Sequence, residues 1–215
     1  MTEEMWTIEA GSSLQAVLDR PDGPPLLRQA LTGALDWQTR NRITVLRALR
    51  APQLAPEWVA ALLALDAAVV VEGDAGSTQM PVAALVEGRL REDIAFLHVP
   101  LADGDQRWGE ARVGRTPADQ PIVAAVAVVE MVDDVVEQAR VALTGVWPEP
   151  VRLAAAPVDL VGGPLDMDGI RSVAEAVEAE VSPEGDFRGS EEYRRAMAGV
   201  LTRRALEKCL GEGRE

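Results

Sequence analysis

The stretch IVAAVAVV, residues 122–129, is apolar at every position and ends at Glu130. A strand that is apolar on both faces lies at the centre of a sheet or is covered on both sides. The run is also far shorter than the ~20 apolar residues that a membrane-spanning helix needs. The stretch therefore predicts a buried strand in the second half of the chain.

Regular elements are expected on both sides of this strand. Alternating and β-branched patterns predict strands at 108–115 and 137–143. After Gly162-Gly163-Pro164 the apolar spacing becomes helical, with Ile170, Val173, Ala174 and Val177 on one face. A last helix is expected to begin at a Ser190 cap. The residues expected on the buried stripe of that helix are Tyr193, Met197, Val200, Leu201 and Ala205. Its arginine pairs, 194–195 and 203–204, are expected on the solvated face.

The first half of the chain begins with a short segment that ends at the Pro- and Gly-rich cluster 21–25. Residues 1–25 are therefore expected to be an N-terminal tail with a short helix at 13–18. After it, helices are expected from residue 26 and at 56–65, the second with Trp58, Leu62 and Leu65 on one apolar stripe. Strands are expected next at 68–71, 77–82 and 94–99. Pro100 and Gly104 mark the seam between the two halves. The predicted domains are 26–103 and 104–211, in a chain of the α+β class: helices on an antiparallel sheet, then a small antiparallel sheet packed on helices.

The composition limits the kinds of partner that the protein can have. The 215 residues include 35 acids and 21 bases, which gives a formal charge of -14. This surplus repels phosphate backbones and anionic lipids, so neither nucleic acid nor a membrane surface is an expected partner. The acidic start of the sequence differs from a signal peptide, and a soluble, cytoplasmic protein is expected.

Few residues are available for catalysis or metal binding. Cys209 is the single cysteine and His98 the single histidine, so no internal disulfide and no metal site is expected. His98 is expected to be structural or exposed, and Cys209 is expected to be a small buried side chain. The residues by themselves predict no catalytic group.

Several motifs in the second half resemble one known family. They are DFRGSEEYRR at 186–195, VLTRRAL at 200–206, GVWPEPVR at 145–152, GPLD at 163–166 and GRTPAD at 114–119. In this order they resemble the C-terminal domain of the FAD-binding medium subunit of molybdenum hydroxylases, a family that includes carbon monoxide dehydrogenase. The resemblance implies an oxidoreductase complex in which this subunit relays electrons through FAD.

The first half resembles the second flavin-binding subdomain of the same family. Arg40-Asn41 and LLALDA at 62–67 match its pattern. The family's Thr-Ile-Gly-Gly-Asn turn is altered here, because Leu46 and Arg47 stand where the glycine pair should be. A glycine pair lets backbone N–H groups approach a diphosphate, and these side chains fill that space. Glu57 stands in place of the flavin-facing Asp.

The resemblance implies four vestigial cofactor-binding positions, Thr44, Arg47, Glu57 and Asp119. Residues 1–24 do not resemble the family's Gly-rich N-terminal flavin subdomain. The first hypothesis is therefore a reduced homologue without bound cofactor that acts as a structural or docking component, as a homo-oligomer or beside molybdenum and iron–sulfur subunits. The alternative is a working FAD-binding electron-transfer subunit whose missing subdomain lies on another chain. A regulatory small-molecule binder using Arg40, Arg47 and Arg50 is a third hypothesis.

Overall fold

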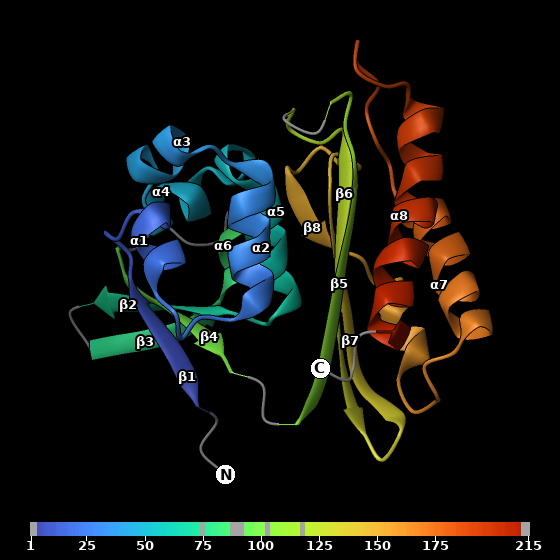
Figure 1. Ribbon diagram of the computed structural model, residues 1–215, viewed down its shortest axis with the longest axis horizontal. Helices are drawn as coiled ribbons and strands as arrows, with labels where there is room; N and C mark the ends of the chain where they lie inside the picture. Colours follow the sequence, from blue (N-terminus) through green and yellow to red (C-terminus); the bar gives the residue numbers. More distant parts are fainter. Residues whose placement is uncertain (1–3, 74–75, 87–92, 102–103, 117–118, 212–215) are drawn as a thin grey trace. The chain divides into compact units, whose positions relative to one another are not determined.

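The structure is a computed structural model that describes residues 4–73, 76–86, 93–101, 104–116 and 119–211. The chain divides into two compact units, Met1–Leu101 and Ala102–Glu215, which are called unit 1 and unit 2 below. Each unit contains one four-stranded antiparallel sheet with helices (Figure 1). The expected α+β class with two antiparallel sheets is confirmed. In the described part of the chain, no helix is long and apolar enough to cross a membrane.

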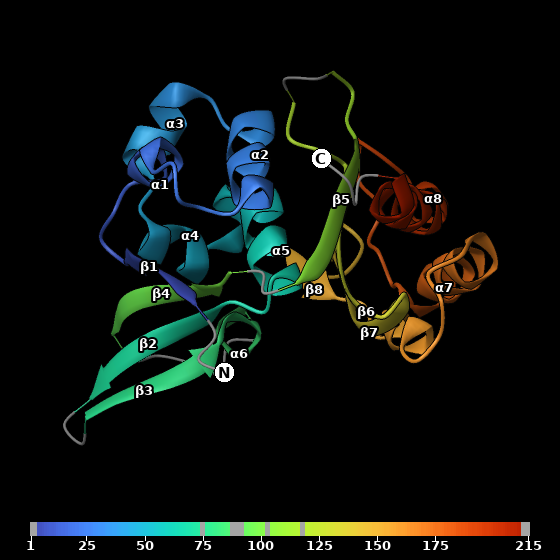
Figure 2. The same cartoon turned by 60° about the horizontal axis from the view of Figure 1, so that its bottom comes forward.

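Unit 1 is built on a sheet whose central strands are β4 and β2. In spatial order its strands are β1 (Met5–Glu9), β4 (Ile94–Pro100), β2 (Ala68–Gly73) and β3 (Gly76–Pro81). Its helices are α1 (Leu14–Asp19), α2 (Pro25–Ala34), α3 (Trp37–Arg42), α4 (Val45–Arg50), the 3-10 turn η1 (Pro52–Leu54), α5 (Pro56–Ala64) and α6 (Val82–Val86). Helices α1 to α5 gather over one face of the sheet (Figure 2).

Helix α5 forms the centre of unit 1, because all nine of its residues are buried. The sequence pattern predicted one apolar stripe through Trp58, Leu62 and Leu65, and these side chains are at most 3% exposed. The helix ends at Ala64 with Leu65 as its C-cap. Asp66 then adopts a φ of 55°, and the Ala67 N–H donates to the Leu62 carbonyl. This left-handed turn leads the chain directly into β2.

The first 25 residues are a correction to the expectation of a tail. Residues 5–9 form β1, which pairs antiparallel with β4 from Met5↔Pro100 to Glu9↔Phe96. Trp6 and Ile8 are buried, as is Leu14 at the start of α1. The short helix expected at 13–18 is present, and Ser13 caps it by accepting the Ala16 N–H at 3.1 Å. The apolar side chains of this short strand become buried because β4 pairs with it. The pattern of residues 5–9 alone could not predict this strand, because β4 is distant in the sequence.

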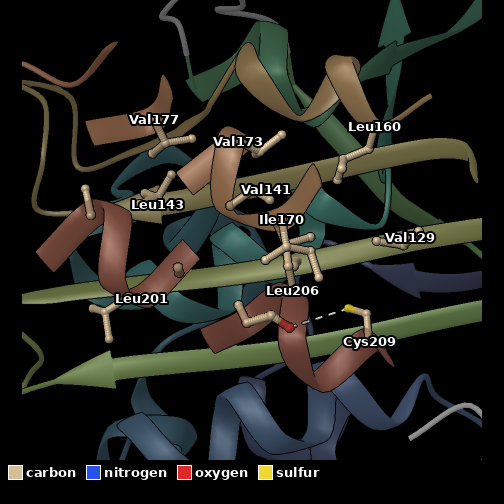
Figure 3. Packing of buried hydrophobic residues seen from close by; sticks show 14 of the residues in the cluster. Val129, Val141, Leu143, Leu160, Ile170, Val173, Val177, Leu201, Leu206 and Cys209 are labelled. Atoms are coloured by element: carbon tan, nitrogen blue, oxygen red, sulfur yellow. Dashed lines mark hydrogen bonds between the residues drawn. The ribbon is translucent and has the colours of Figure 1, made fainter. Parts of the chain in front are cut away.

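Unit 2 is a four-stranded meander with helices on one face. Its strands follow the sequence order β5 (Asp105–Val113), β6 (Val123–Val132), β7 (Val135–Thr144) and β8 (Val151–Leu153). They are followed by the 3-10 turn η2 (Ala156–Leu160) and by helices α7 (Met167–Glu180) and α8 (Glu191–Gly211). Leu143 of β7, Ile170 of α7 and Leu206 of α8 belong to one buried cluster between the sheet and the helices (Figure 3). The Cys209 thiol is buried there and donates to the Ala205 carbonyl at 3.5 Å.

Strand β6 is buried on both faces, as its unbroken apolar run predicted. Val123, Ala125, Ala127 and Val129 belong to the cluster beneath the helices, while the alternate residues 124, 126 and 128 are at most 2% exposed. The strand pairs with β5 on one side and β7 on the other. It is therefore an internal strand of the sheet.

The buried face of α8 differs from the predicted one. Tyr193 is 38% exposed, and Met197 and Val200 are only partly buried. The residues that are buried are Arg194, Ala198, Gly199, Leu201, Thr202, Ala205, Leu206 and Cys209. The apolar periodicity of this helix is weak, since small and polar residues occupy much of its contact face. This allows a close approach to β5, where a Cβ added to Gly109 would lie 2.2 Å from the Ala205 carbonyl oxygen.

Arg194 was expected on the solvated face of α8, and this expectation is wrong. The residue is 6% exposed, and its Nη1 donates to the carbonyls of Ile122 at 3.0 Å and Gly145 at 2.9 Å. Its Nη2 donates to Asp186 Oδ1 at 2.7 Å. This hydrogen bond is the main reason that the Asp186 pKa lies below its usual value. The guanidinium thus joins four segments of unit 2: the residue just before β6, the residue just after β7, the 186–189 turn and α8.

We expect Gly109→Ala to destabilise unit 2 by about 3 kcal/mol, because a rigid helix carbonyl occupies the space of the new methyl group. Denaturant unfolding of the full chain measures the change. Gly211→Ala is the matched control in α8, since no atom lies within 4 Å of its added Cβ. Equal stability of G109A and the wild type would contradict the close packing of α8 on β5.

We expect Arg194→Ala to cost about 3 kcal/mol or more, because three carbonyls and one carboxylate lose a buried donor. The neighbouring Arg195 pairs with Glu191 on the same helix at 2.8 Å and is half-buried. Arg195→Ala should therefore change the free energy of unfolding by no more than about 0.5 kcal/mol. Equal stability of Arg194→Ala and Arg195→Ala would contradict the conclusion that the Arg194 side chain holds four segments of unit 2 together.

Candidate functional site

The altered turn is the segment in which Leu46 and Arg47 stand in place of a glycine pair. In the structure this segment forms the N-terminus of helix α4. Thr44 is the N-cap, and its Oγ1 accepts the Arg47 N–H at 3.2 Å. Leucine, arginine and alanine are strong helix formers, so Leu46, Arg47 and Ala48 extend a helix where a glycine pair would leave an open turn. The helix ends at Arg50, shortly before Pro52.

The backbone N–H groups at this helix start already have acceptors inside the protein. Val45 donates to the Ser12 carbonyl at 2.9 Å and Leu46 to the Ala10 carbonyl at 2.8 Å. Arg47 donates to the Thr44 hydroxyl, and Ala48 donates to the Thr44 carbonyl at 2.9 Å. These are the donors that an anion at a helix N-terminus would use. The turn as folded does not fit a diphosphate.

The acceptors come from the loop between β1 and α1. The Ala10 N–H is bonded to the Ala95 carbonyl at 2.9 Å, and the Leu14 N–H is bonded to the Ile43 carbonyl at 2.9 Å. Ser13 and Thr44 form an isolated antiparallel bridge. This loop and the α4 N-terminus therefore satisfy each other's polar groups as part of the fold.

The side chains at the altered turn differ in exposure. Thr44 and Leu46 are half-buried, whereas Arg47 is exposed. Helix α4 brings Thr44 and Arg47 together through the capping hydrogen bond. The Arg47 guanidinium carries a charge into solvent, but a flexible side chain does not replace a set of oriented N–H groups.

Glu57 is the second residue of α5 and is 5% exposed. A carboxylate suits the first turn of a helix, where the dipole is positive. Its burial leaves almost no surface that a ligand arriving from solvent could contact. Glu57 therefore lies within the core of unit 1.

Asp119, the fourth predicted position, belongs to unit 2. Its N–H donates to the Thr116 carbonyl at 3.2 Å, and its carboxylate lies 3.8 Å from Arg115 Nε. Both residues line a surface hollow of about 340 Å³ that also includes Arg112.

A larger hollow of about 550 Å³ lies where β5 meets α8. Its lining mixes charges of both signs: Glu110 and Glu207 with Arg112, Arg204 and Lys208. Lys208 Nζ donates to the Glu110 carbonyl at 2.7 Å. The sequence did not identify this hollow, because it forms between segments that are far apart along the chain.

The two residues with potential metal or thiol chemistry are parts of the sheets and core. His98 is half-buried on β4 and stands opposite Thr7 of β1 and Ala68 of β2. Cys209 is enclosed in the core of unit 2. Among the residues that the structure describes, no group of three or more His, Cys, Asp or Glu side chains could hold a metal ion.

A helix-capping signal could have located α4 in advance. Asp36 and Thr44 precede α3 and α4, and each accepts an N–H three residues later, Asp36 at 2.6 Å. Such a spacing marks a helix start. The contacts to Ala10 and Ser12 have no comparable local signal.

Comparisons with known proteins cover residues of both units. Residues 111–209 match the family described as the CO dehydrogenase flavoprotein C-terminal domain. The chain is 25% identical over 190 residues to the glyceraldehyde dehydrogenase medium chain of Sulfolobus acidocaldarius, covering 86% of this chain and 67% of that one. It is 27% identical over 188 residues to the carbon monoxide dehydrogenase medium chain of Hydrogenophaga pseudoflava, covering 85% and 66%. The chain thus spans about two thirds of the length of these relatives.

A solved structure shows the same fold. Carbon monoxide dehydrogenase from Hydrogenophaga pseudoflava aligns with a TM-score of 0.83 and 26% identity, over 96% of this chain and 75% of that one. Family match, sequence similarity and fold agree. Over most of its length the chain is therefore similar to the medium chain of carbon monoxide dehydrogenase, and residues 111–209 of its unit 2 match the flavoprotein C-terminal domain.

Proposed function

We propose that this chain is a structural or docking component of a molybdenum hydroxylase complex and holds no FAD at the altered turn. The observation that supports this most is the full use of the N–H groups of residues 45–48 by protein acceptors. A diphosphate at that position would have to displace the Ala10 and Ser12 carbonyls, leaving them without donors. Such a loss costs about 1–3 kcal/mol for each buried group.

The proposed partners are molybdenum and iron–sulfur subunits. The relatives are named medium chains, and the solved Hydrogenophaga pseudoflava enzyme is described as a form that lacks the Mo-pyranopterin moiety of its molybdenum cofactor. In this proposal the oxidation of substrate belongs to the partner chain, and no residue of this chain is assigned a catalytic role. A homo-oligomer is the other form that a structural component could take.

A working FAD-binding electron-transfer subunit is the alternative function. It is favoured by the match of residues 111–209 to a flavoprotein domain. In this case the remaining flavin contacts would come from another chain, and FAD would supply the electron-relaying chemistry. Retention of FAD only when a partner chain is present would support this alternative.

We expect the purified chain, mixed with FAD and then desalted, to show no visible flavin absorption band. The physical reason is that the α4 turn offers no set of N–H donors to the diphosphate. Bovine serum albumin taken through the same mixing and desalting measures non-specific carry-over. A stoichiometric flavin band in the isolated chain would overturn the proposal.

We expect Leu46→Gly with Arg47→Gly to leave FAD binding absent. Removing the side chains opens space, but the Leu46 amide still faces the Ala10 carbonyl and the Arg47 amide still faces the Thr44 hydroxyl. Fluorescence titration with FAD measures the affinity. The control is Leu46→Ala with Arg47→Ala, which also removes both side chains but keeps the helix propensity. Saturable binding in the glycine variant alone would show that side-chain volume, rather than amide use, excludes the cofactor.

A further inference from the structure

The segment Asp186–Gly189 before α8 exposes a large aromatic side chain. Phe187 is 88% exposed and stands at the tip of a tight turn. Single exposed apolar residues are common on protein surfaces and by themselves carry no meaning. What distinguishes Phe187 is the backbone that holds it.

The turn is closed by hydrogen bonds in both directions. The Asp186 N–H donates to the Gly189 carbonyl at 3.0 Å, and the Gly189 N–H donates to the Asp186 carbonyl at 3.2 Å. Asp186 Oδ1 also accepts the N–H groups of Arg188 at 2.8 Å and Gly189 at 3.1 Å. The polar groups on both sides of Phe187 are therefore fixed within four residues.

Side chains anchor this turn to the body of unit 2. The buried Arg194 guanidinium donates to Asp186 at 2.7 Å and to the Gly189 carbonyl at 3.3 Å. Arg188 donates to the Gln120 carbonyl. Immediately after the turn, the Ser190 hydroxyl accepts the Tyr193 N–H at 3.2 Å and starts the long helix α8. Phe187 is thus held on a rigid base.

A rigid, exposed aromatic side chain is well suited to bind a protein. Aromatic residues, phenylalanine among them, are enriched at the cores of interfaces, where a few positions carry most of the binding energy. Their conformational cost on binding is small when the backbone is already ordered. The fold of unit 2 gains little from Phe187, since its ring is almost fully in solvent.

The charges around Phe187 indicate the chemistry of the partner. The exposed acids near it are Glu184, Asp186, Glu191 and Glu192. Asp186 and Glu191 are ion-paired with Arg194 and Arg195, while no ion pair within the described residues involves Glu184 or Glu192. Against these four acids stand three arginines, Arg188, Arg194 and Arg195, so the local surplus is one negative charge, in a chain whose formal charge is -14. A second copy would present the same acids, and an anionic lipid surface would be repelled.

We propose that Phe187 is the anchor of a docking site for a different protein chain, one that offers an apolar pocket bordered by lysine or arginine side chains. This inference rests on the proposed docking function and assigns it to a surface. The turn inserts Phe187 into the pocket, and Glu184 and Glu192 face the basic border. The acidic surroundings favour this partner over a second copy.

The test compares variants of the full chain, tagged and purified from its own cells. The wild type should be recovered with a different chain in a fixed ratio, and Phe187→Ala should reduce that recovery about tenfold or more. Val158→Ala is the matched control, because Val158 is an apolar residue of unit 2 that is 65% exposed and lies outside the turn. It should retain the partner as the wild type does. Both variants should keep the wild-type Tm, because both side chains are exposed.

Two further measurements test the chemistry of the partner. Glu184→Lys with Glu192→Lys should lower recovery, and added salt should weaken the wild-type complex. A photo-crosslinking phenylalanine derivative at position 187 should react with a segment of the partner that is apolar and flanked by lysine or arginine.

The outcomes separate this inference from the proposed function. Recovery of the wild type without any partner would overturn both. Recovery of a partner at wild-type level by F187A would overturn the inference and leave the proposed function standing. Crosslinking of position 187 to a second copy or to lipid, or improved binding by the charge-reversed variant, would also overturn the inference.

Discussion

The buried guanidinium of Arg194 is the interaction on which unit 2 depends. It donates to carbonyls just before β6 and just after β7, and it also holds Asp186 in the turn before its own helix. Gly145 makes this convergence possible. It has a φ of +74°, and a Cβ there would lie 2.2 Å from the Ile122 carbonyl oxygen. A charge removed from water requires such a complete set of acceptors, so displacing any one of these segments would leave part of the buried guanidinium without a partner.

Hydrogen bonds between backbone groups also explain why the altered turn in unit 1 differs from a phosphate site. A glycine-rich turn leaves N–H groups that a ligand completes. Here the helix-forming residues 46–48 close the turn into α4, and the loop after β1 supplies the missing acceptors. At this position, which resembles a cofactor site in sequence, backbone carbonyls of the protein itself therefore accept the N–H groups that a ligand would use. This is the physical basis for proposing a docking role rather than a flavin-binding one.

Patterns that repeat within one element were read correctly from the sequence. The run at 122–129 predicted a strand buried on both faces, and the spacing of Ile170, Val173 and Val177 predicted the buried face of α7. Ser190 was identified as the cap of α8. The resemblance to the medium subunit was likewise carried by local motifs, and comparison with known proteins confirmed it. Local propensity and periodicity suffice for these features because their causes lie within a few residues.

Other features needed partners that are distant along the chain. Residues 5–9 become a strand only beside β4, and Arg194 is buried only because the Ile122 and Gly145 carbonyls, 72 and 49 residues away, lie next to it. The same holds for the amides of α4, which find their acceptors at Ala10 and Ser12. The sequence by itself determined the α+β class, most of the elements and the resemblance to the medium subunit. The tertiary structure decided which polar groups are already satisfied and which side chain remains exposed, because hydrogen bonding and burial depend on neighbours that only the folded chain brings together.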